Sequence, residues 1–569
     1  MIVDQTALGA DGERRYHAVI VGAGAAGLTL AQALAGATGG RARVLVVEAG
    51  GLKESREGRA DYAGEVAPGS HHPAADLYRV RALGGTSRIW GGRCIPYDPI
   101  DLAPRPWVPG AGWPIAHGEL AAHYPAACEA AEAGRFEFDP ENLFGEARAA
   151  LLPGLDGELV RTTVERFSRP TNFWTRFGGV LLRAADVHVL LAAPVTAVRL
   201  EPGGGAVAGV EIALHGGGRQ LVRADAYVLA LGGLETTRLL LASDDVRPAG
   251  IGNDSDQLGR CYMSHLCAAA GAVAFAGPAA RVAHDYARDC DGIYLRRRLA
   301  PTEAAQRRHR LLNVSFRTYL PEPGDPAHRD PVLSAMFLAK SFVQREYAAK
   351  LAAGAGAGRV GGYARHAANI ARRPAPLARF ARVWLRERVL AARKLPSVVL
   401  PSADNTYALE FHAEQAPDPD SRVTLGEARD RHGLRRLRID WRVGAQDIDS
   451  LQRAHALLGA ELERTGTGRL AIDPAVIADR ARRDGVVGGH HIGLTRMSAG
   501  PRDGVVDRDC RVHGVDGLYI ASASVLPTSS QANPTLTVLA LALRLADHLA
   551  DRLSHRHGAA APARGEAAA

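Results

Sequence analysis

Two polar side chains near the C-terminal end of the chain have the types needed for acid–base chemistry. The sequence reads Gly-Gly-His490-His491-Ile-Gly, and Asn533-Pro534 follows later. A neutral imidazole accepts a proton near pH 7, and an amide donates hydrogen bonds to oxygen. We predict that Asn533 caps a helix with Pro534 at its first position, because Asn is a preferred cap and the stretch 538–549 is apolar. The free N–H groups of such a helix start favour an anion, or a group that becomes anionic.

The N-terminal part of the chain carries the pattern of a dinucleotide-binding unit. An apolar strand, a glycine-rich turn, a helix, a second strand and an acidic residue occupy 17–21, 22–27, 28–35, 44–47 and Glu48. In such a unit Gly22 makes the tight turn, Gly24 lets the backbone approach a pyrophosphate, and Gly27 lets the helix pack on the strand. Glu48 would bind ribose hydroxyls. A glycine turn with only a packing role is the alternative, and the pattern does not choose between NAD and FAD.

A second glycine-rich segment, residues 81–92, reads Arg-Ala-Leu-Gly-Gly-Thr-Ser-Arg-Ile-Trp-Gly-Gly. Small residues let backbone lie against a flat ring, although glycines also serve plain turns. With the stretch 484–547, this segment resembles the glucose–methanol–choline (GMC) family of flavin-dependent oxidoreductases. The sequence Asn-Pro-Thr at 533–535 resembles the sugar-oxidising branch, which includes pyranose oxidases and fructose dehydrogenases. The resemblance implies FAD.

The same resemblance assigns site residues. It implies that His490 and Asn533 are catalytic, with the adjacent His491 a weaker candidate for a substrate contact. Pyranose oxidases that bind FAD covalently carry a His where this chain has Ile89, so we expect non-covalent FAD. Val195 matches a position near the adenine, but a plain core contact fits it equally well. The implied FAD contacts are Gly22, Gly24, Gly27, Glu48, Gly84, Gly85, Ser87, Trp90, Gly91, Val195, Ser522, Asn533, Pro534 and Thr535.

The chemistry implied by this resemblance is oxidation of a CH–OH group on a sugar, aminocyclitol or other polyol. Hydride passes to flavin N5, His490 accepts the hydroxyl proton, and Asn533 holds the same oxygen. Two alternatives stay open: a flavin-containing lyase of the hydroxynitrile lyase type, and a flavin-binding protein without turnover. The sequence does not identify the electron acceptor, which could be oxygen, a quinone or a protein.

The expected fold is α/β, or α+β overall, with two domains. A Rossmann-like FAD-binding domain comprises 1–260 and 484–555, and a substrate domain comprises 261–483. We expect the second domain to contain an antiparallel sheet flanked by helices, with strands at 268–275, 312–319, 407–414 and 421–425. Side chains alternate along a strand. Either the face with His412 and Glu414 or the face with Phe411, Ala413 and Gln415 floors the substrate pocket, and a polar row that simply faces solvent is the equally plausible alternative.

Composition limits the class of protein. The chain has 569 residues, of which 47% are hydrophobic and 23% charged, as in ordinary soluble proteins. Its six cysteines form no Cys-x-x-Cys pair, so we expect no metal site and reduced thiols. No apolar run reaches the roughly 18 residues of a membrane span. The polar N-terminus lacks a signal-peptide core, and Arg14-Arg15 runs directly into the first strand, so we expect a cytoplasmic protein.

Residues 340–395 concentrate the positive charge of the chain. Thirteen Lys and Arg residues stand against Glu346 and Glu387, a net charge of +11, which leaves 8 − 11 = −3 for the rest. The net charge of +8 is therefore local and does not indicate a nucleic-acid-binding protein. We interpret the segment as an insertion, either a solvated helical flap or a basic surface for an acidic substrate, a partner or an anionic membrane. Residues 556–569 are expected to be a disordered tail.

Overall fold

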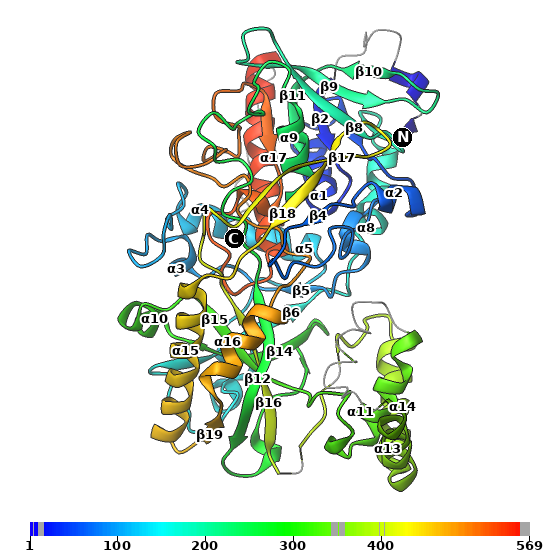
Figure 1. Cartoon of the computed structure of the whole chain (residues 1–569). Helices are drawn as coiled ribbons and strands as arrows, with labels where there is room; N and C mark the ends of the chain where they lie inside the picture. Colours follow the sequence, from blue (N-terminus) through cyan, green and yellow to red (C-terminus); the bar gives the residue numbers. More distant parts are fainter. Residues whose placement is uncertain are drawn as a thin grey trace, which may run out of the picture.

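The computed structural model describes residues 1–3, 5–8, 16–342, 351, 359–397, 399–402 and 404–557. Two main sheets divide these residues into an upper and a lower part in the view of Figure 1. The upper part contains the N-terminal end of the chain and the long helix α17 (Thr535–His557). Mixed α/β architecture with two domains was the expectation, and the structure confirms it.

The upper sheet is parallel and has the strand order β1-β7-β3-β2-β11-β20. These strands are Ile2–Val3, Val187–Leu190, Val44–Val47, Tyr16–Val21, Ala224–Leu229 and Leu518–Ile520. The central strands are buried on both faces, because helices cover a parallel sheet on both sides. Helix α1 (Ala25–Ala37) follows β2 directly and packs against α17. The predicted strand–turn–helix–strand unit is therefore present.

Glycine is required at the turn between β2 and α1. Gly22 has φ +107°, and a Cβ there would lie 2.6 Å from the carbonyl oxygen of Ala230 in the neighbouring strand region. A Cβ on Gly27 would lie 2.0 Å from the carbonyl oxygen of Gly22. Any larger side chain would force the helix away from the sheet, so the spacing of these glycines fixes the turn.

The lower sheet is antiparallel, with the order β19-β12-β16-β15-β14-β6-β5 and β13 paired to β14. In this order the strands are Gly468–Ala471, Leu266–Phe275, Thr406–Ala413, Val314–Tyr319, Tyr294–Pro301, Val160–Phe167 and Arg93–Cys94, with β13 at Ala287–Arg288. Helices α15 (Ala445–Arg464) and α16 (Pro474–Arg483) pack on it. Three of the four predicted strands lie in this sheet, within a few residues of the expected bounds.

The sheets divide the chain differently from the predicted boundaries. Strands β5 and β6 belong to the lower sheet, although they fall within 1–260. The fourth predicted strand, β17 (Arg422–Arg429), pairs with β18 (Arg435–Asp440), which pairs in turn with β4 (Glu65–Val66) of the upper part. The chain crosses between the two parts more often than the expected crossings at 260 and 484 allow, because strand pairing partners lie far apart in sequence.

The remaining elements connect and cover these sheets. A small antiparallel sheet is formed by β8 (Val195–Leu200), β9 (Val207–Ala213) and β10 (Arg219–Val222). The other helices are α2 (Arg56–Ala60), α3 (Pro99–Leu102), α4 (His117–Ala121), α5 (Tyr124–Ala130), α6 (Pro140–Phe144), α7 (Glu146–Ala149), α8 (Phe173–Arg183), α9 (Gly233–Ala242), α10 (Glu303–His309) and α11 (Pro331–Leu338).

The basic insertion forms helices that dock on α11. Helices α13 (Arg359–Arg372) and α14 (Pro374–Trp384) are separated by Arg373, and Pro374 begins the second helix. His366 stacks on Phe337 with ring centroids 4.3 Å apart, and it pairs with Ser334 Oγ at 3.1 Å. This group lies to one side of the lower sheet (Figure 1). Parts of the predicted insertion, 343–350 and 352–358, and residues 558–569 of the predicted tail lie outside the described residues.

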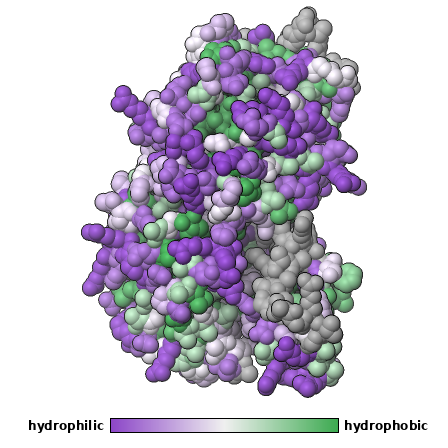
Figure 2. Space-filling view, viewed as in Figure 1, coloured by the Kyte–Doolittle hydropathy of each residue, from purple (hydrophilic) through white to green (hydrophobic). Residues whose placement is uncertain are grey.

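The visible surface is predominantly hydrophilic over both parts of the molecule (Figure 2). Among the helices that the structure describes, none is long and apolar enough to cross a membrane.

Candidate active site

A cavity of about 1830 Å³ is lined by strands of the lower sheet and by the turns that follow strands of the upper sheet. Its lining includes the glycine turn after β2, His490 and Asn533, and residues of the insertion helix α14. This volume exceeds the roughly 300–1,000 Å³ of a typical small-molecule site. The cavity therefore has room for a dinucleotide together with a small substrate.

Most of the predicted FAD contacts line this cavity. They are Gly22, Gly24, Glu48, Gly85, Ser87, Trp90, Gly91, Val195, Ser522, Asn533, Pro534 and Thr535. Gly27 and Gly84 do not line it but shape the two turns. Gly84 has φ +88°, and a Cβ there would lie 2.5 Å from Asn172 Oδ1.

The local geometry at the glycine turn fits a dinucleotide. A Cβ on Gly85 would lie 2.9 Å from the Cα of Gly24, so the two glycine segments touch backbone to backbone. A Cβ on Gly24 would meet no atom within 4 Å, because this residue faces the cavity. Glu48 accepts backbone hydrogen bonds from Ala23 (2.9 Å) and Gly50 (2.8 Å), which hold its carboxylate at the cavity wall. The residues present therefore fit FAD.

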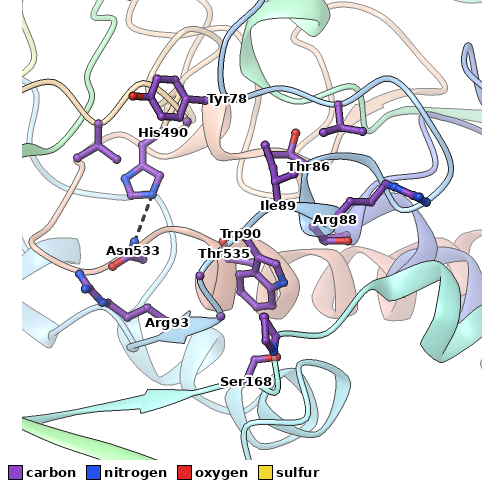
Figure 3. A pocket seen from close by; sticks show the side chains of 18 of the residues that line it. Tyr78, Thr86, Arg88, Ile89, Trp90, Arg93, Ser168, His490, Asn533 and Thr535 are labelled. Carbon is purple, nitrogen blue, oxygen red and sulfur yellow. Dashed lines mark hydrogen bonds between the residues drawn. The ribbon is translucent and has the colours of Figure 1, made fainter. Parts of the chain in front are cut away.

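His490 and Asn533 meet in the cavity (Figure 3). Asn533 Nδ2 lies 3.2 Å from His490 Nε2, and Asn533 Oδ1 is buried without a hydrogen-bond partner. Helix α17 begins at Thr535, so Pro534 precedes the helix instead of occupying its first position. The predicted capping role of the Asn533 side chain is wrong, because its amide is turned toward His490 instead.

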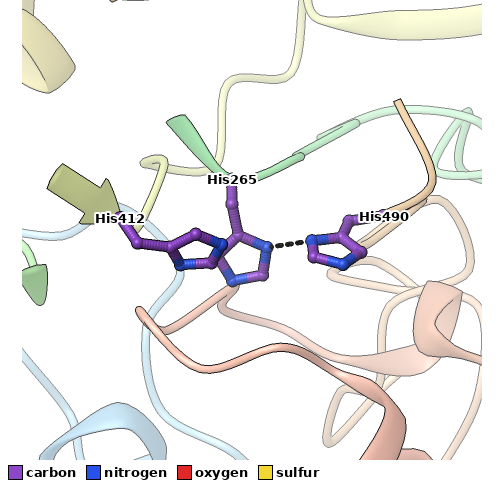
Figure 4. Close-up of side chains that lie close together, drawn as sticks. All are labelled: His265, His412 and His490. Carbon is purple, nitrogen blue, oxygen red and sulfur yellow. Dashed lines mark hydrogen bonds between the residues drawn. The ribbon is translucent and has the colours of Figure 1, made fainter. Parts of the chain in front are cut away.

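His265 and His490 are joined by a 2.8 Å contact between their Nδ1 atoms (Figure 4). The Nε2 atom of His265 lies 3.0 Å from the carbonyl oxygen of Ser529, which can only accept a hydrogen bond. His265 therefore carries its proton on Nε2, and its Nδ1 is an acceptor. His490 must then donate from Nδ1, which leaves its Nε2 unprotonated and facing Asn533. This tautomer, assigned from the hydrogen-bond network, is the one that a base acting through Nε2 needs.

The electrostatics of the site keep these imidazoles neutral. Burial, followed by the proximity of His265, His491 and Arg93, lowers the pKa of His490 well below its ordinary value. Burial lowers the pKa of His265 to about 4. His412, from β16, stacks on His265 at 4.6 Å and donates from Nδ1 to the carbonyl oxygen of Gln531 at 2.6 Å. Burial, with the neighbouring His265 and Arg93 charges, also lowers the pKa of His412 well below its ordinary value.

The polar face of β16 (Thr406–Ala413) lines the cavity. Glu410 and His412 line it, so the polar face was the correct one of the two alternatives. Glu414, on the same face, pairs with the buried Arg105 and does not line the cavity.

Within the part of the chain that the structure describes, one group of side chains has the spacing of a metal site. Nitrogen atoms of His265, His412 and His490 lie within 4.8 Å of one another. The 2.8 Å contact between His265 and His490 is a normal hydrogen-bond distance and needs no ion. The expectation of no metal therefore stays a prediction.

His491 has a different environment. Its Nε2 lies 3.0 Å from the carbonyl oxygen of Gly488, and its ring packs near His72 and Tyr262. The contacts that would orient a catalytic base, those with His265 and Asn533, are made by His490 and not by His491. His265 was not among the predicted site residues, although it lies in Met-Ser-His just after the predicted domain crossing.

Comparisons with known proteins agree with this geometry. Residues 417–542 match the model of the GMC oxidoreductase C-terminal domain. This part of the chain is therefore similar to the GMC oxidoreductases.

Curated relatives match segments of the chain. The 6'''-hydroxyparomomycin C oxidase of Streptomyces lividus is 34% identical over 159 residues, 26% of this chain and 28% of that protein. The C-glycoside 3-oxidase of Arthrobacter globiformis is 33% identical over 129 residues, 22% of this chain and 23% of that protein. The large subunit of fructose dehydrogenase from Gluconobacter japonicus is 26% identical over 165 residues, 29% of each chain. The matches thus span less than a third of these relatives.

The likeness in structure is more extensive than the likeness in sequence. The crystal structure of pyridoxine 4-oxidase from Mesorbium loti superposes with a TM-score of 0.51 at 20% identity. The superposition covers 94% of this chain and 99% of the other. At this identity the comparison establishes the fold alone, which agrees with the predicted mixed α/β fold.

Proposed function

We propose that this protein is an FAD-dependent oxidoreductase that oxidises a CH–OH group of a sugar, aminocyclitol or other polyol. The observation that carries the proposal is the hydrogen-bond chain from Ser529 through His265 to His490, which leaves His490 Nε2 free of a proton beside Asn533. Support also comes from the matching segments of the GMC relatives, which are named as oxidases and a dehydrogenase.

The chain's own residues orient the alcohol and move its proton. A substrate hydroxyl replaces Asn533 as the donor to His490 Nε2, and the second amide hydrogen of Asn533 donates to the hydroxyl oxygen. His490 accepts the proton at Nε2, and its Nδ1–H strengthens its bond to His265 as the ring becomes cationic. When bound, FAD supplies the acceptor for the hydride that leaves the carbon.

The binding mode of FAD is part of the proposal. Ile89 lines the cavity where a linking His would stand, so FAD is held without a covalent bond. The electron acceptor stays open. A cytoplasmic location is proposed because reduced thiols are the simpler interpretation of six cysteines without a Cys-x-x-Cys pair. The insertion presents exposed Phe342 (91% exposed) and Leu390 (73% exposed) beside its basic residues, which supports the proposal of a partner or membrane contact there.

Anaerobic mixing of the holoenzyme with a panel of sugars and polyols tests the activity. Bleaching of the flavin absorption band by an alcohol supports the proposal, whereas no bleaching by any member favours a lyase or a protein without turnover. His490→Ala should bind FAD with an unchanged spectrum and reduce it roughly 10²–10⁴-fold more slowly, the usual scale for a lost general base. His491→Ala is the matched control. If His491→Ala slows flavin reduction and His490→Ala does not, the base is His491.

A further inference from the structure

The part of the lower sheet that floors the cavity carries more positive than negative charge. The charged side chains on this face come from β5, β6, β14, β15 and β16. They are Arg93, Arg296, Arg298 and Arg317 against Glu165 and Glu410. Four guanidinium groups against two carboxylates leave an excess of 4 − 2 = +2. Arg296 and Arg298 are buried, whereas Arg93 and Arg317 are partly exposed, with 21% and 10% of their side chains accessible. A buried charge is unfavourable unless it is paired, so a buried guanidinium without a carboxylate needs a counterion.

The two carboxylates are already shared among three of the arginines. Arg317 contacts both of them, with Glu165 at 3.6 Å and Glu410 at hydrogen-bond distance. Arg93 Nε lies 3.1 Å from Glu165, in a geometry that makes no hydrogen bond. Arg298 lies 3.9 Å from Glu165 and donates to Gln531 Oε1 at 2.7 Å. These carboxylates therefore leave no full charge for a fourth guanidinium.

Arg296 is the fourth. It is 6% exposed, lines the cavity, and has no carboxylate within ion-pair distance among the residues that the structure describes. Its terminal nitrogen donates to the carbonyl oxygen of Thr318, and its buried Nε has no hydrogen-bond partner. The guanidinium lies 5.6 Å from the centre of the Tyr286 ring. A buried guanidinium with a free N–H at a cavity wall is a ready partner for an anion.

This charged floor adjoins the proposed reaction site. Arg93 is one of the charges that disfavour protonation of His490, and Arg93 and Arg317 both do so for His412. In Figure 3 the Arg93 side chain lies beside Asn533. His490, Arg93, Arg296 and Arg317 therefore line one continuous cavity. At the other end of the cavity, Arg388 and Lys394 of the insertion line the wall and add positive charge.

We propose that the substrate carries an anionic group, a carboxylate or a phosphate, which binds Arg296 while the CH–OH group lies at His490. The proposal rests on the proposed function for the position of the alcohol. Guanidinium groups bind both kinds of anion with paired hydrogen bonds, and in a site shielded from water such bonds are strong. The +11 charge of the insertion attracts such a substrate toward the cavity and raises its rate of association.

The test compares the holoenzyme's affinity for matched ligands: glucose, glucuronate and glucose 6-phosphate. Dissociation constants come from calorimetry, and flavin reduction is followed anaerobically as a second readout. The wild-type protein should bind one of the anionic ligands at least 10-fold more tightly than glucose, because a hydrogen bond between charged groups is worth about one to two powers of ten. Glucuronate and glucose 6-phosphate distinguish a carboxylate from a phosphate.

Variants on a single strand provide the control. Arg296→Gln should lose the preference for the anion, and Arg296→Lys should keep part of it. Arg297→Gln removes the same charge from the opposite face of β14, where Arg297 binds the carbonyl oxygens of Arg148 and Ala149. This control should leave the preference unchanged.

Three results would overturn the inference: a wild-type protein without any preference for anions, equal losses in Arg296→Gln and Arg297→Gln, or a preference that survives in a folded Arg296→Gln. A changed flavin potential in Arg296→Gln without any change in anion affinity would assign the charge to the flavin and not to the substrate. If anions bind as expected but no alcohol bleaches the flavin, the proposed function fails and the anion site stands. If only neutral polyols bleach the flavin, the proposed function stands and the anion site fails.

Discussion

Replacing His265 tests whether this residue sets the protonation state of His490. The imidazole of His265 accepts from His490 Nδ1 at 2.8 Å and donates to Ser529 at 3.0 Å. In His265→Leu the acceptor is gone, so His490 can carry its proton on Nε2, where it no longer acts as a base. A cationic His490 also loses a hydrogen bond worth about 1.5–3 kcal/mol. We therefore expect flavin reduction to slow by roughly 10- to 150-fold.

His265→Asn is the matched variant for this experiment. Both variants lose the contact with Ser529, but the Asn side chain places an oxygen near the position of Nδ1 and keeps an acceptor for His490. Rapid mixing under anaerobic conditions measures the reduction rate as a function of pH. The wild-type rate should be level above pH 6.5 and fall only in more acidic solution, because the pKa of His490 lies well below its ordinary value. His265→Leu should move this fall to still lower pH, and His265→Asn should move it less.

Equal rates and equal pH profiles for His265→Leu, His265→Asn and the wild type would refute the tautomer argument. Equal slowing in the two variants would show that His265 acts through Ser529 and the local fold. Thermal unfolding of both variants separates these cases from general destabilisation, since a purely structural role predicts a loss of stability without a shift of the pH profile.

Three further outcomes follow from the structure. Acid precipitation of the holoenzyme should leave a colourless pellet and a yellow supernatant, because Ile89 cannot link FAD; flavin in the washed pellet would contradict this. The melting temperature should fall as the pH is lowered from 6.5 toward 4, because unfolded histidines take up protons that the buried His72 and His265, each with a pKa of about 4, do not. Burial raises the pKa of Asp101 to about 8, so the unfolded chain releases this proton at a lower pH than the folded protein does. The melting temperature should therefore also fall as the pH rises toward 8. Deleting 359–394 with a short linker should change substrate affinity more than FAD binding, and loss of bound FAD would show that these helices belong to the core.

The sequence predicted the parts of the site that depend on local pattern. The glycine turn after β2 was predictable because only Gly tolerates the close backbone approach at Gly22 and Gly27. His490 was predictable because it lies in a recognisable segment. His265 was not, because its role depends on pairing β12 with β16 and on a carbonyl of a distant loop. The same holds for the boundary at 260, where β5 and β6 join a sheet whose other strands lie far along the chain.

Asn533 shows how tertiary context overrides a correct local preference. Asn before Pro and an apolar stretch is a sound helix-start pattern, and α17 does begin two residues later. Its amide nevertheless donates to His490, and its oxygen is buried without a partner. An unsatisfied buried acceptor costs about 1–3 kcal/mol of stability. If Asn533 served only as a helix cap, its oxygen would instead accept a backbone N–H. Asn533 Oδ1 lies beside His490 and Arg93, where a bound ligand can donate a hydrogen bond to it. The free energy lost in the free protein is then recovered as affinity for the ligand.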